Sequence, residues 1–101
     1  MPRQERDGSL ANYRIFETDE YIKKFSKLPP SNAPSIQKKL HSYVYPQLIE
    51  NPFYGKNIKK LRDYDPETWR YRIGKYRLFY LIDEDEKIIY LLTIDLRKDA
   101  Y

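Results

Sequence analysis

The sequence predicts an α+β domain with the element order β-α-α-β-β-β, in which two antiparallel helices pack on one face of a mostly antiparallel sheet. Apolar residues recur at helical intervals within residues 18–51 and alternate with polar ones from residue 68 onward. Strands that are apolar on one side need a helical cover. The chain has 101 residues and no linker-like tract, so residues 13–101 are expected to form a single domain and the polar residues 1–12 a mobile extension.

The first half of the domain should contain one strand and two helices. Residues 13–17 mix aromatic and β-branched side chains, which is typical of a strand. Thr18 is a good N-cap for a helix that Pro29-Pro30 must end. Residues 31–51 again show a helical apolar face, but Pro46 deletes a backbone hydrogen bond at a cost of roughly 3 kcal/mol. The second helix should therefore bend or break just before Pro46.

The second half should contain a loop and a three-stranded meander. Residues 53–67 show no sustained period, so they are expected to form a loop that carries much of the basic charge. Gly74-Lys75 suits the turn of a β-hairpin, and the acidic run Asp83–Glu86 suits the next connection. The three expected strands cover residues 68–73, 76–82 and 87–96.

Composition excludes several classes of protein. The chain has no Cys and a single His, His41, so thiolate chemistry is ruled out and a metal site is not expected. No stretch approaches the roughly 20 apolar residues of a membrane span, and the N-terminal residues do not resemble a signal peptide. These features favour a soluble, unexported, cytoplasmic protein.

Basic residues are concentrated in one segment. The formal net charge is only +4, yet residues 55–77 hold eight basic residues against three acidic ones, a local balance of +5. Strand alternation places Arg70 and Arg72 on the face opposite the helices, and Arg77 on the next strand should share that face. Arg97, just after the last strand, could join them. Guanidinium groups suit phosphate oxygens, although alternating arginines on a strand can also serve only solubility and edge protection.

Several segments together resemble one known family. They are the tracts WRYRI and YRLFY, the terminal RKDAY and the preceding NPFYGKNIKKL. As a set they resemble the RelE/ParE toxin superfamily, most closely the RelE branch of mRNA interferases. The resemblance implies a RelE-like fold and a toxin of a type II toxin-antitoxin system that cuts mRNA on the ribosome. It also implies a RelB-like cognate antitoxin, and no metal or other cofactor, because the family reaction is attack of the ribose 2′-hydroxyl on the adjacent phosphate.

The resemblance assigns roles to individual residues. Basic residues on the first hairpin strand would contact the mRNA, an arginine on the next strand and one after the last strand would stabilise the phosphate, and a terminal tyrosine would assist. The matching positions are Arg70, Arg72, Arg77, Arg97 and Tyr101. Four further residues either track ribosomal RNA phosphates or are simply solvated: Lys56, Lys59, Lys60 and Arg62. Trp69 is expected to pack on the core rather than to stack on a base.

Two departures from the family pattern leave alternatives open. Asp95-Leu96 stands where relatives often carry Gly-His, and Arg70 and Arg72 stand where they often carry lysine. Arginine, with a pKa above roughly 12, is a poor proton acceptor. The alternatives are a ParE-like inhibitor of DNA gyrase and a catalytically inactive relative that binds only RNA or its antitoxin.

Overall fold

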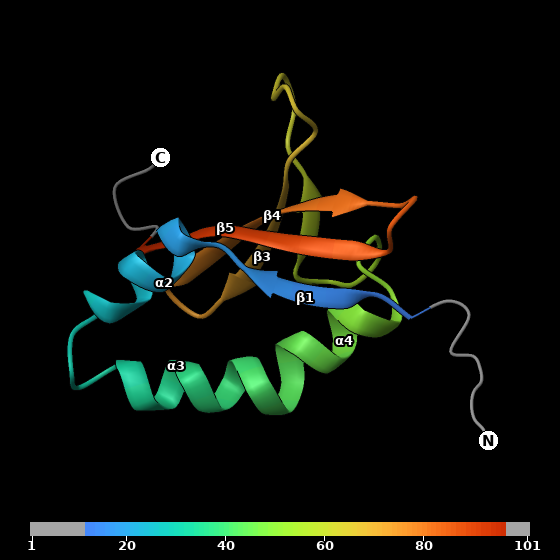
Figure 1. Cartoon of the computed structure of the whole chain (residues 1–101). Helices are drawn as coiled ribbons and strands as arrows, with labels where there is room; N and C mark the ends of the chain where they lie inside the picture. The colour runs from blue at the N-terminus through green and yellow to red at the C-terminus, as the bar shows by residue number, and fades with distance from the viewer. Residues whose placement is uncertain (1–11, 97–101) are drawn as a thin grey trace.

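A computed structural model describes residues 12–96 and contains a five-stranded sheet with helices on one face (Figure 1). This confirms the predicted α+β class. The predicted N-terminal extension lies almost entirely outside the described residues. In chain order the elements are β1 (Arg14–Glu17), α2 (Asp19–Ser26), α3 (Ala33–Lys39), the π-helical turn η2 (Leu40–Val44), α4 (Tyr45–Glu50), β2 (Ile58–Lys60), β3 (Trp69–Ile73), β4 (Tyr76–Asp83) and β5 (Ile88–Leu96).

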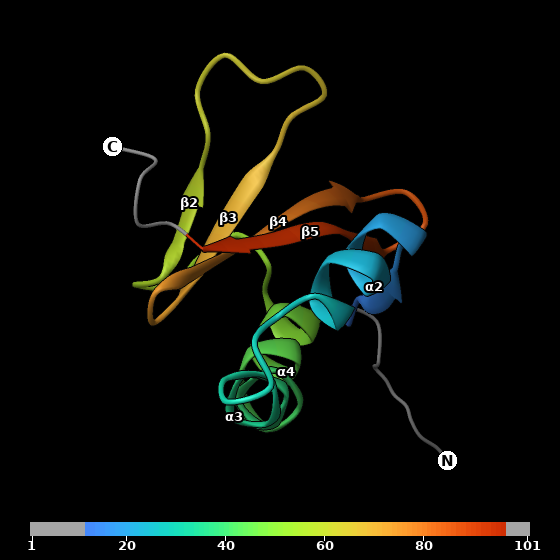
Figure 2. The same ribbon diagram turned by 90° about the vertical axis from the view of Figure 1, so that its left-hand side faces the viewer.

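The sheet has the strand order β1-β5-β4-β3-β2. β1 runs parallel to β5, and every other pair is antiparallel, so the predicted meander of β3, β4 and β5 is confirmed. The strand β2 was not predicted, because its three residues lie in a segment expected to be loop. It extends the sheet beyond β3, and the connection between β2 and β3 projects away from the helical layer (Figure 2).

The helices begin and bend for local reasons that the sequence carries. The hydroxyl of Thr18 accepts a hydrogen bond from the backbone N–H of Tyr21, which caps α2 as predicted. The second helix is interrupted where expected, because η2 separates α3 from α4. In that turn the backbone N–H of Tyr45 donates to the carbonyl of Leu40, and Pro46, which has no N–H, falls in the first turn of α4.

The core between helices and sheet is rich in tyrosine. Tyr71 and Tyr80 are essentially fully buried, and each hydroxyl donates a hydrogen bond: Tyr71 to Oε1 of Gln47 at 2.6 Å, and Tyr80 to the carbonyl of Pro52 at 2.8 Å. A buried phenol therefore keeps a polar partner. Trp69 packs edge-on against Phe53 with ring centroids 5.4 Å apart, as the expected packing residue.

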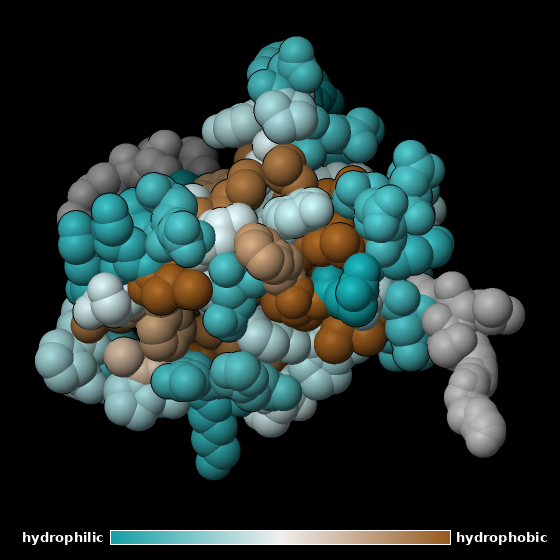
Figure 3. Space-filling view, in the orientation of Figure 1, coloured by the Kyte–Doolittle hydropathy of each residue, from teal (hydrophilic) through white to brown (hydrophobic). Residues whose placement is uncertain are grey.

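The surface is not uniform. In the space-filling view, hydrophilic side chains cover the projecting β2–β3 connection and the β4–β5 turn, and hydrophobic side chains gather between them (Figure 3). Within residues 12–96, no helix has the length and apolar character needed to cross a membrane.

Candidate functional site

Three predicted arginines meet on the face of the sheet that points away from the helices. Arg72 and Arg77 lie directly opposite each other in the β3–β4 hairpin. Arg70, two residues before Arg72, shares its side of β3 and is paired with Lys59 on β2. We call these four residues the arginine face. The hairpin register that the sequence could not fix thus brings together cations from three strands.

The three arginines differ in burial. Arg77 is only 7% exposed, Arg70 is partly buried and Arg72 is exposed. The Arg77 guanidinium lies 5.4 Å from the centroid of the Phe79 ring, two positions further along the same side of β4. A purely solvating role would leave such a side chain in water. The burial of Arg77 therefore favours a positioned guanidinium over the solubility interpretation.

A carboxylate beside the arginines forms an ion pair with a lysine of α2. Asp95 on β5 lies opposite Arg77 in the sheet register. Its Oδ1 accepts a hydrogen bond of 2.6 Å from Nζ of Lys24 on α2. This bond, the largest influence, raises the pKa of the Lys24 ammonium. Asp95 is thus held in an ion pair at the edge of the arginine face, and the sequence pattern did not reveal Lys24 as its partner.

Two of the predicted site residues, Arg97 and Tyr101, lie outside the described residues, so their roles stay predictions. The described part of β5 ends at Leu96, which is 42% exposed and is paired with Tyr76 at the start of β4. The described part of β5 therefore ends beside the start of β4, next to Arg77. Arg97, the next residue in the sequence, was expected near Arg77.

The four basic residues predicted to contact ribosomal RNA are all exposed but do not form one group. Only Lys59 joins the arginine face, through its pairing with Arg70. Lys60, with the opposite strand parity, forms an ion pair of 2.8 Å with Glu67. Lys56 and Arg62 lie on the loops before and after β2.

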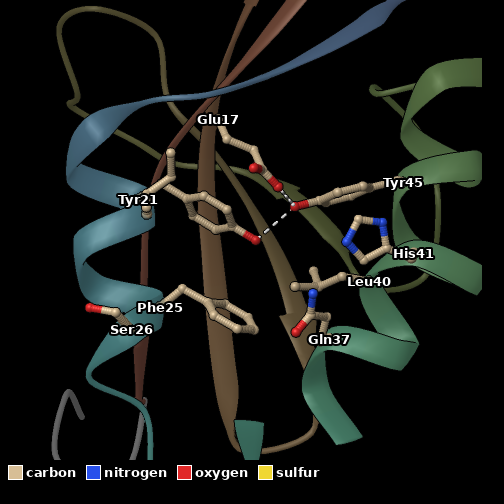
Figure 4. Close-up of a pocket in the computed structure, with 9 residues that line it drawn as sticks. Glu17, Tyr21, Phe25, Ser26, Gln37, Leu40, His41 and Tyr45 are labelled. Atoms are coloured by element: carbon tan, nitrogen blue, oxygen red, sulfur yellow. Dashed lines mark hydrogen bonds between the residues drawn. The ribbon is translucent and has the colours of Figure 1, made fainter. Parts of the chain in front are cut away.

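A second feature, which the sequence did not reveal, is a pocket of about 240 Å³ between α2 and the α3–η2 segment. On one side of the pocket the Tyr45 hydroxyl donates to Oε2 of Glu17, and the hydroxyls of Tyr21 and Tyr45 are hydrogen-bonded at 2.8 Å (Figure 4). Burial raises the pKa of Tyr21 to about 12 and also raises the pKa of Tyr45. Both phenols stay protonated near neutral pH, and their hydrogen bonds join β1, α2 and α4.

His41 is exposed at the rim of this pocket and packs edge-on against Tyr45, with ring centroids 4.9 Å apart. It lies on the helical layer, and the arginine face lies on the other side of the sheet. Among residues 12–96, no group of three His, Cys, Asp or Glu side chains is arranged to hold a metal ion.

The helix-covered sheet and its cationic hairpin agree with the fold expected for toxins of type II toxin-antitoxin systems, and the comparison with known families shows that class directly. Residues 11–101 match the family model described as the ParE toxin of the type II toxin-antitoxin system parDE, so the chain belongs to this family. It is a toxin of the RelE/ParE superfamily. A curated relative, named "Putative toxin RelE1", comes from Methanocaldococcus jannaschii. It is 32% identical over 80 residues, which span 79% of this chain and 84% of the relative.

Solved structures agree with this assignment. The toxin-antitoxin complex RelBE2 from Mycobacterium tuberculosis contains a chain that is 26% identical, with a TM-score of 0.65, covering 85% of this chain and 99% of that one. The archaeal RelE–RelB complex from Pyrococcus horikoshii gives the same TM-score at 21% identity, covering 87% and 98%. The isolated E. coli RelE toxin gives 0.61 at 21% identity, covering 83% of each chain. At 21% identity, the latter two similarities show a shared fold and nothing more.

Proposed function

We propose that this toxin is a ribosome-dependent mRNA endoribonuclease of the RelE type, which blocks translation by cutting mRNA in the cytoplasm. The observation that carries the proposal is the arginine face. Arg72 and Arg77 are direct cross-strand neighbours, and Arg70 lies beside them on the same side of β3. Planar guanidinium groups from two strands can grip neighbouring phosphate oxygens of one RNA backbone.

The proposed chemistry is a displacement at phosphorus. The ribose 2′-oxygen loses its proton and bonds to the adjacent phosphorus, the bond to the 5′-oxygen of the next nucleotide breaks, and that oxygen takes up a proton. A cyclic 2′,3′-phosphate and a free 5′-hydroxyl result. Arg77, held by burial beside Phe79, is positioned to stabilise the negative charge that grows on the phosphate oxygens.

Proton transfer requires a group other than the arginines of the face, because guanidinium groups keep their protons near neutral pH. Asp95 forms an ion pair with Lys24, and we do not assign it a role in proton transfer. We assign 2′-oxygen activation to Tyr101 or to a group of the ribosome, and the second phosphate-stabilising arginine to Arg97.

We further propose that a RelB-like antitoxin holds the toxin inactive. The RelE–RelB and RelBE2 structures support this, because each is a toxin-antitoxin complex that contains a chain with this fold. An acidic antitoxin segment would fit the arginine face by charge and would exclude RNA from it.

Inhibition of DNA gyrase is the second candidate, because the matching family model is that of the ParE toxin. ParE-like inhibition would act by binding and would not need the arginines as a catalytic group. Retention of Arg70, Arg72 and Arg77 on one face supports the RelE-type proposal over this one.

The deciding experiment is expression of the wild-type chain in bacteria, with primer-extension mapping of transcripts and a parallel supercoiling assay on purified gyrase. We expect codon-phased cuts that disappear in Arg77→Ala. Lys59→Ala should reduce cutting by weakening RNA binding, whereas the matched control Lys60→Ala, whose side chain lies off the arginine face, should cut like wild type. Trapped gyrase without transcript cleavage would establish the ParE-like function, and the absence of both would indicate an inactive relative.

A further inference from the structure

The helical layer carries positive charge between its acidic ends, Asp19-Glu20 and Glu50. Between residues 21 and 49 the sequence has five lysines and one histidine but no aspartate or glutamate. Two of these lysines, Lys38 and Lys39, are in the last turn of α3. The arginine face therefore does not hold all of the concentrated positive charge.

Lys39 lies between two adjoining hollows beside the turn of the β3–β4 hairpin. The hollows have volumes of about 120 and 150 Å³, and Lys39, Ile73 and Gly74 line both of them. They share three lining residues and therefore adjoin, and we call the two hollows together the hairpin groove. The groove residues that matter for binding are Lys39, Tyr43, Asn57, Arg72 and Lys75.

Hydrogen bonds fix the walls of this groove. The side-chain amide of Asn32, before α3, donates to the hydroxyl of Tyr76 on β4 at 2.9 Å. The backbone N–H of Arg72 donates to the carbonyl of Asn57 at 2.9 Å. Gly74 adopts a φ of 57°, the left-handed conformation that the hairpin turn requires. The helix and the hairpin are thus held at a set separation.

Within residues 12–96, the structure shows no ion pair that involves the cations of the groove. Lys24–Asp95 and Lys60–Glu67 are ion pairs within residues 12–96, and neither involves Lys39, Arg72 or Lys75. Tyr43, one helical turn after Lys39, is 61% exposed. A groove with several cations and one exposed aromatic ring matches the combination that binds single-stranded nucleic acid, in which phosphates meet cations and a base stacks on the ring.

We infer that the hairpin groove binds nucleotides that flank the cleavage site, so that one RNA strand passes from the arginine face around the hairpin. Arg72 joins the two surfaces, because the residue borders the groove while its side chain belongs to the arginine face, opposite Arg77. Lys39 and Lys75 would hold phosphates, and Tyr43 would stack on a base. The inference rests on the proposed function, since it extends the binding site for the same RNA. An acidic peptide would satisfy the lysines but would leave the exposed ring without a role, so RNA fits the groove better.

Binding of uncleavable RNA tests this inference. Oligouridine with 2′-O-methyl groups, of about 12 nucleotides, is long enough to contact both the arginine face and the groove, whereas a trinucleotide is shorter than the smallest usual site of about 4 nucleotides. Fluorescence anisotropy of both ligands is measured for the full chain at several salt concentrations. The groove variant is Lys39→Ala/Lys75→Ala. Its charge-matched control is Lys23→Ala/Lys27→Ala, which removes two exposed lysines at α2 that do not line the groove.

We expect the groove variant to bind the longer RNA roughly tenfold more weakly. The slope of log K against log salt should become shallower by about 1.4, because two phosphate contacts are lost. Its affinity for the trinucleotide should match that of the control. Tyr43→Ala should weaken binding of the longer RNA without changing the salt slope. Equal affinities of groove variant and control for the longer RNA would overturn the inference. Retained RNA affinity together with lost binding of poly-glutamate would overturn it in favour of an acidic-peptide site.

Ribosome cleavage assays on the same variants separate this inference from the proposed function. Loss of long-RNA binding in the groove variant supports the groove even if the wild type never cuts mRNA, in which case only the nuclease proposal fails. If the wild type cuts mRNA but the groove variant binds RNA like the control, only the groove inference fails.

Discussion

Arg72 and Arg77 lie directly opposite each other across the β3–β4 hairpin. Like charges at such cross-strand positions repel and reduce stability. Their pairing therefore contributes nothing favourable to folding by itself, but it places two guanidinium groups where one phosphate backbone can meet both.

The Arg72→Ala variant separates the two effects. Relief of the repulsion should leave the free energy of unfolding unchanged or raise it by about 0.5 kcal/mol, while cleavage of mRNA on ribosomes should fall. Chemical denaturation and primer extension measure the two quantities, with Arg72→Lys as the control that keeps the charge. A clear loss of stability in Arg72→Ala would contradict this interpretation of the pair.

Arg77→Lys tests whether geometry matters beyond charge. Lysine keeps the positive charge and an aliphatic stem against Phe79, but it lacks the planar set of donors. We expect cleavage to fall by a factor of roughly 100, while the free energy of unfolding changes by less than about 1 kcal/mol. Arg14→Lys, at an exposed position on the edge strand β1, is the matched control. Cleavage by Arg77→Lys at the wild-type rate would show that this site needs only a point charge.

Lys24→Ala should affect catalysis through Asp95. Without Lys24, the Asp95 carboxylate lies opposite Arg77 with its charge no longer balanced by α2, so it should weaken phosphate binding and lower cleavage severalfold. Both side chains of the ion pair are more than a third exposed, so stability should fall by at most about 1 kcal/mol.

A double-mutant cycle checks that prediction. Adding Asp95→Asn to Lys24→Ala removes the unbalanced carboxylate and should restore cleavage toward that of wild type. If the double variant cuts as poorly as Lys24→Ala alone, then Lys24 acts on RNA directly and not through Asp95.

The features that the sequence predicted correctly are those with a local signal. Period-two alternation placed Arg70 and Arg72 on one face of β3, and the missing N–H of Pro46 located the helix bend. The strand β2 escaped prediction because three residues are too few to establish a period, and its place in the sheet comes from pairing with β3.

The contacts that escaped prediction join segments far apart in the chain. Lys24 and Asp95 are 71 positions apart, and each looks like an ordinary surface residue within its own element. The Tyr21–Tyr45–Glu17 network likewise links two helices and a strand, and nothing in the residue pattern indicates that these side chains are hydrogen-bonded. Such pairs depend on how the elements pack, which residue patterns along one chain do not specify.

The same tyrosine network gives the protein a defined response to alkaline pH. Burial raises the pKa of Tyr21 from 10 to about 12, and it raises that of Tyr45 as well. Unfolding exposes both phenols, which then ionise near pH 10, so the unfolded state binds fewer protons than the folded state above that pH. The stabilising contribution of Tyr21 is therefore complete below about pH 10 and is lost as the pH rises toward about 12. Over this range the free energy of unfolding falls by about 1.4 kcal/mol per pH unit for each buried tyrosine with a raised pKa.

Tyr45→Phe tests this response. The variant loses the hydrogen bonds to Glu17 and Tyr21, so we expect its free energy of unfolding near neutral pH to fall by about 1 to 2 kcal/mol. Between about pH 10 and 12 its stability should fall less steeply than that of wild type, because one buried phenol is gone. Urea denaturation at several pH values measures both effects, and Tyr54→Phe, at a position that is 78% exposed, is the control. Parallel stability curves for wild type and Tyr45→Phe would show that Tyr45 ionises as readily in the folded protein as in the unfolded chain.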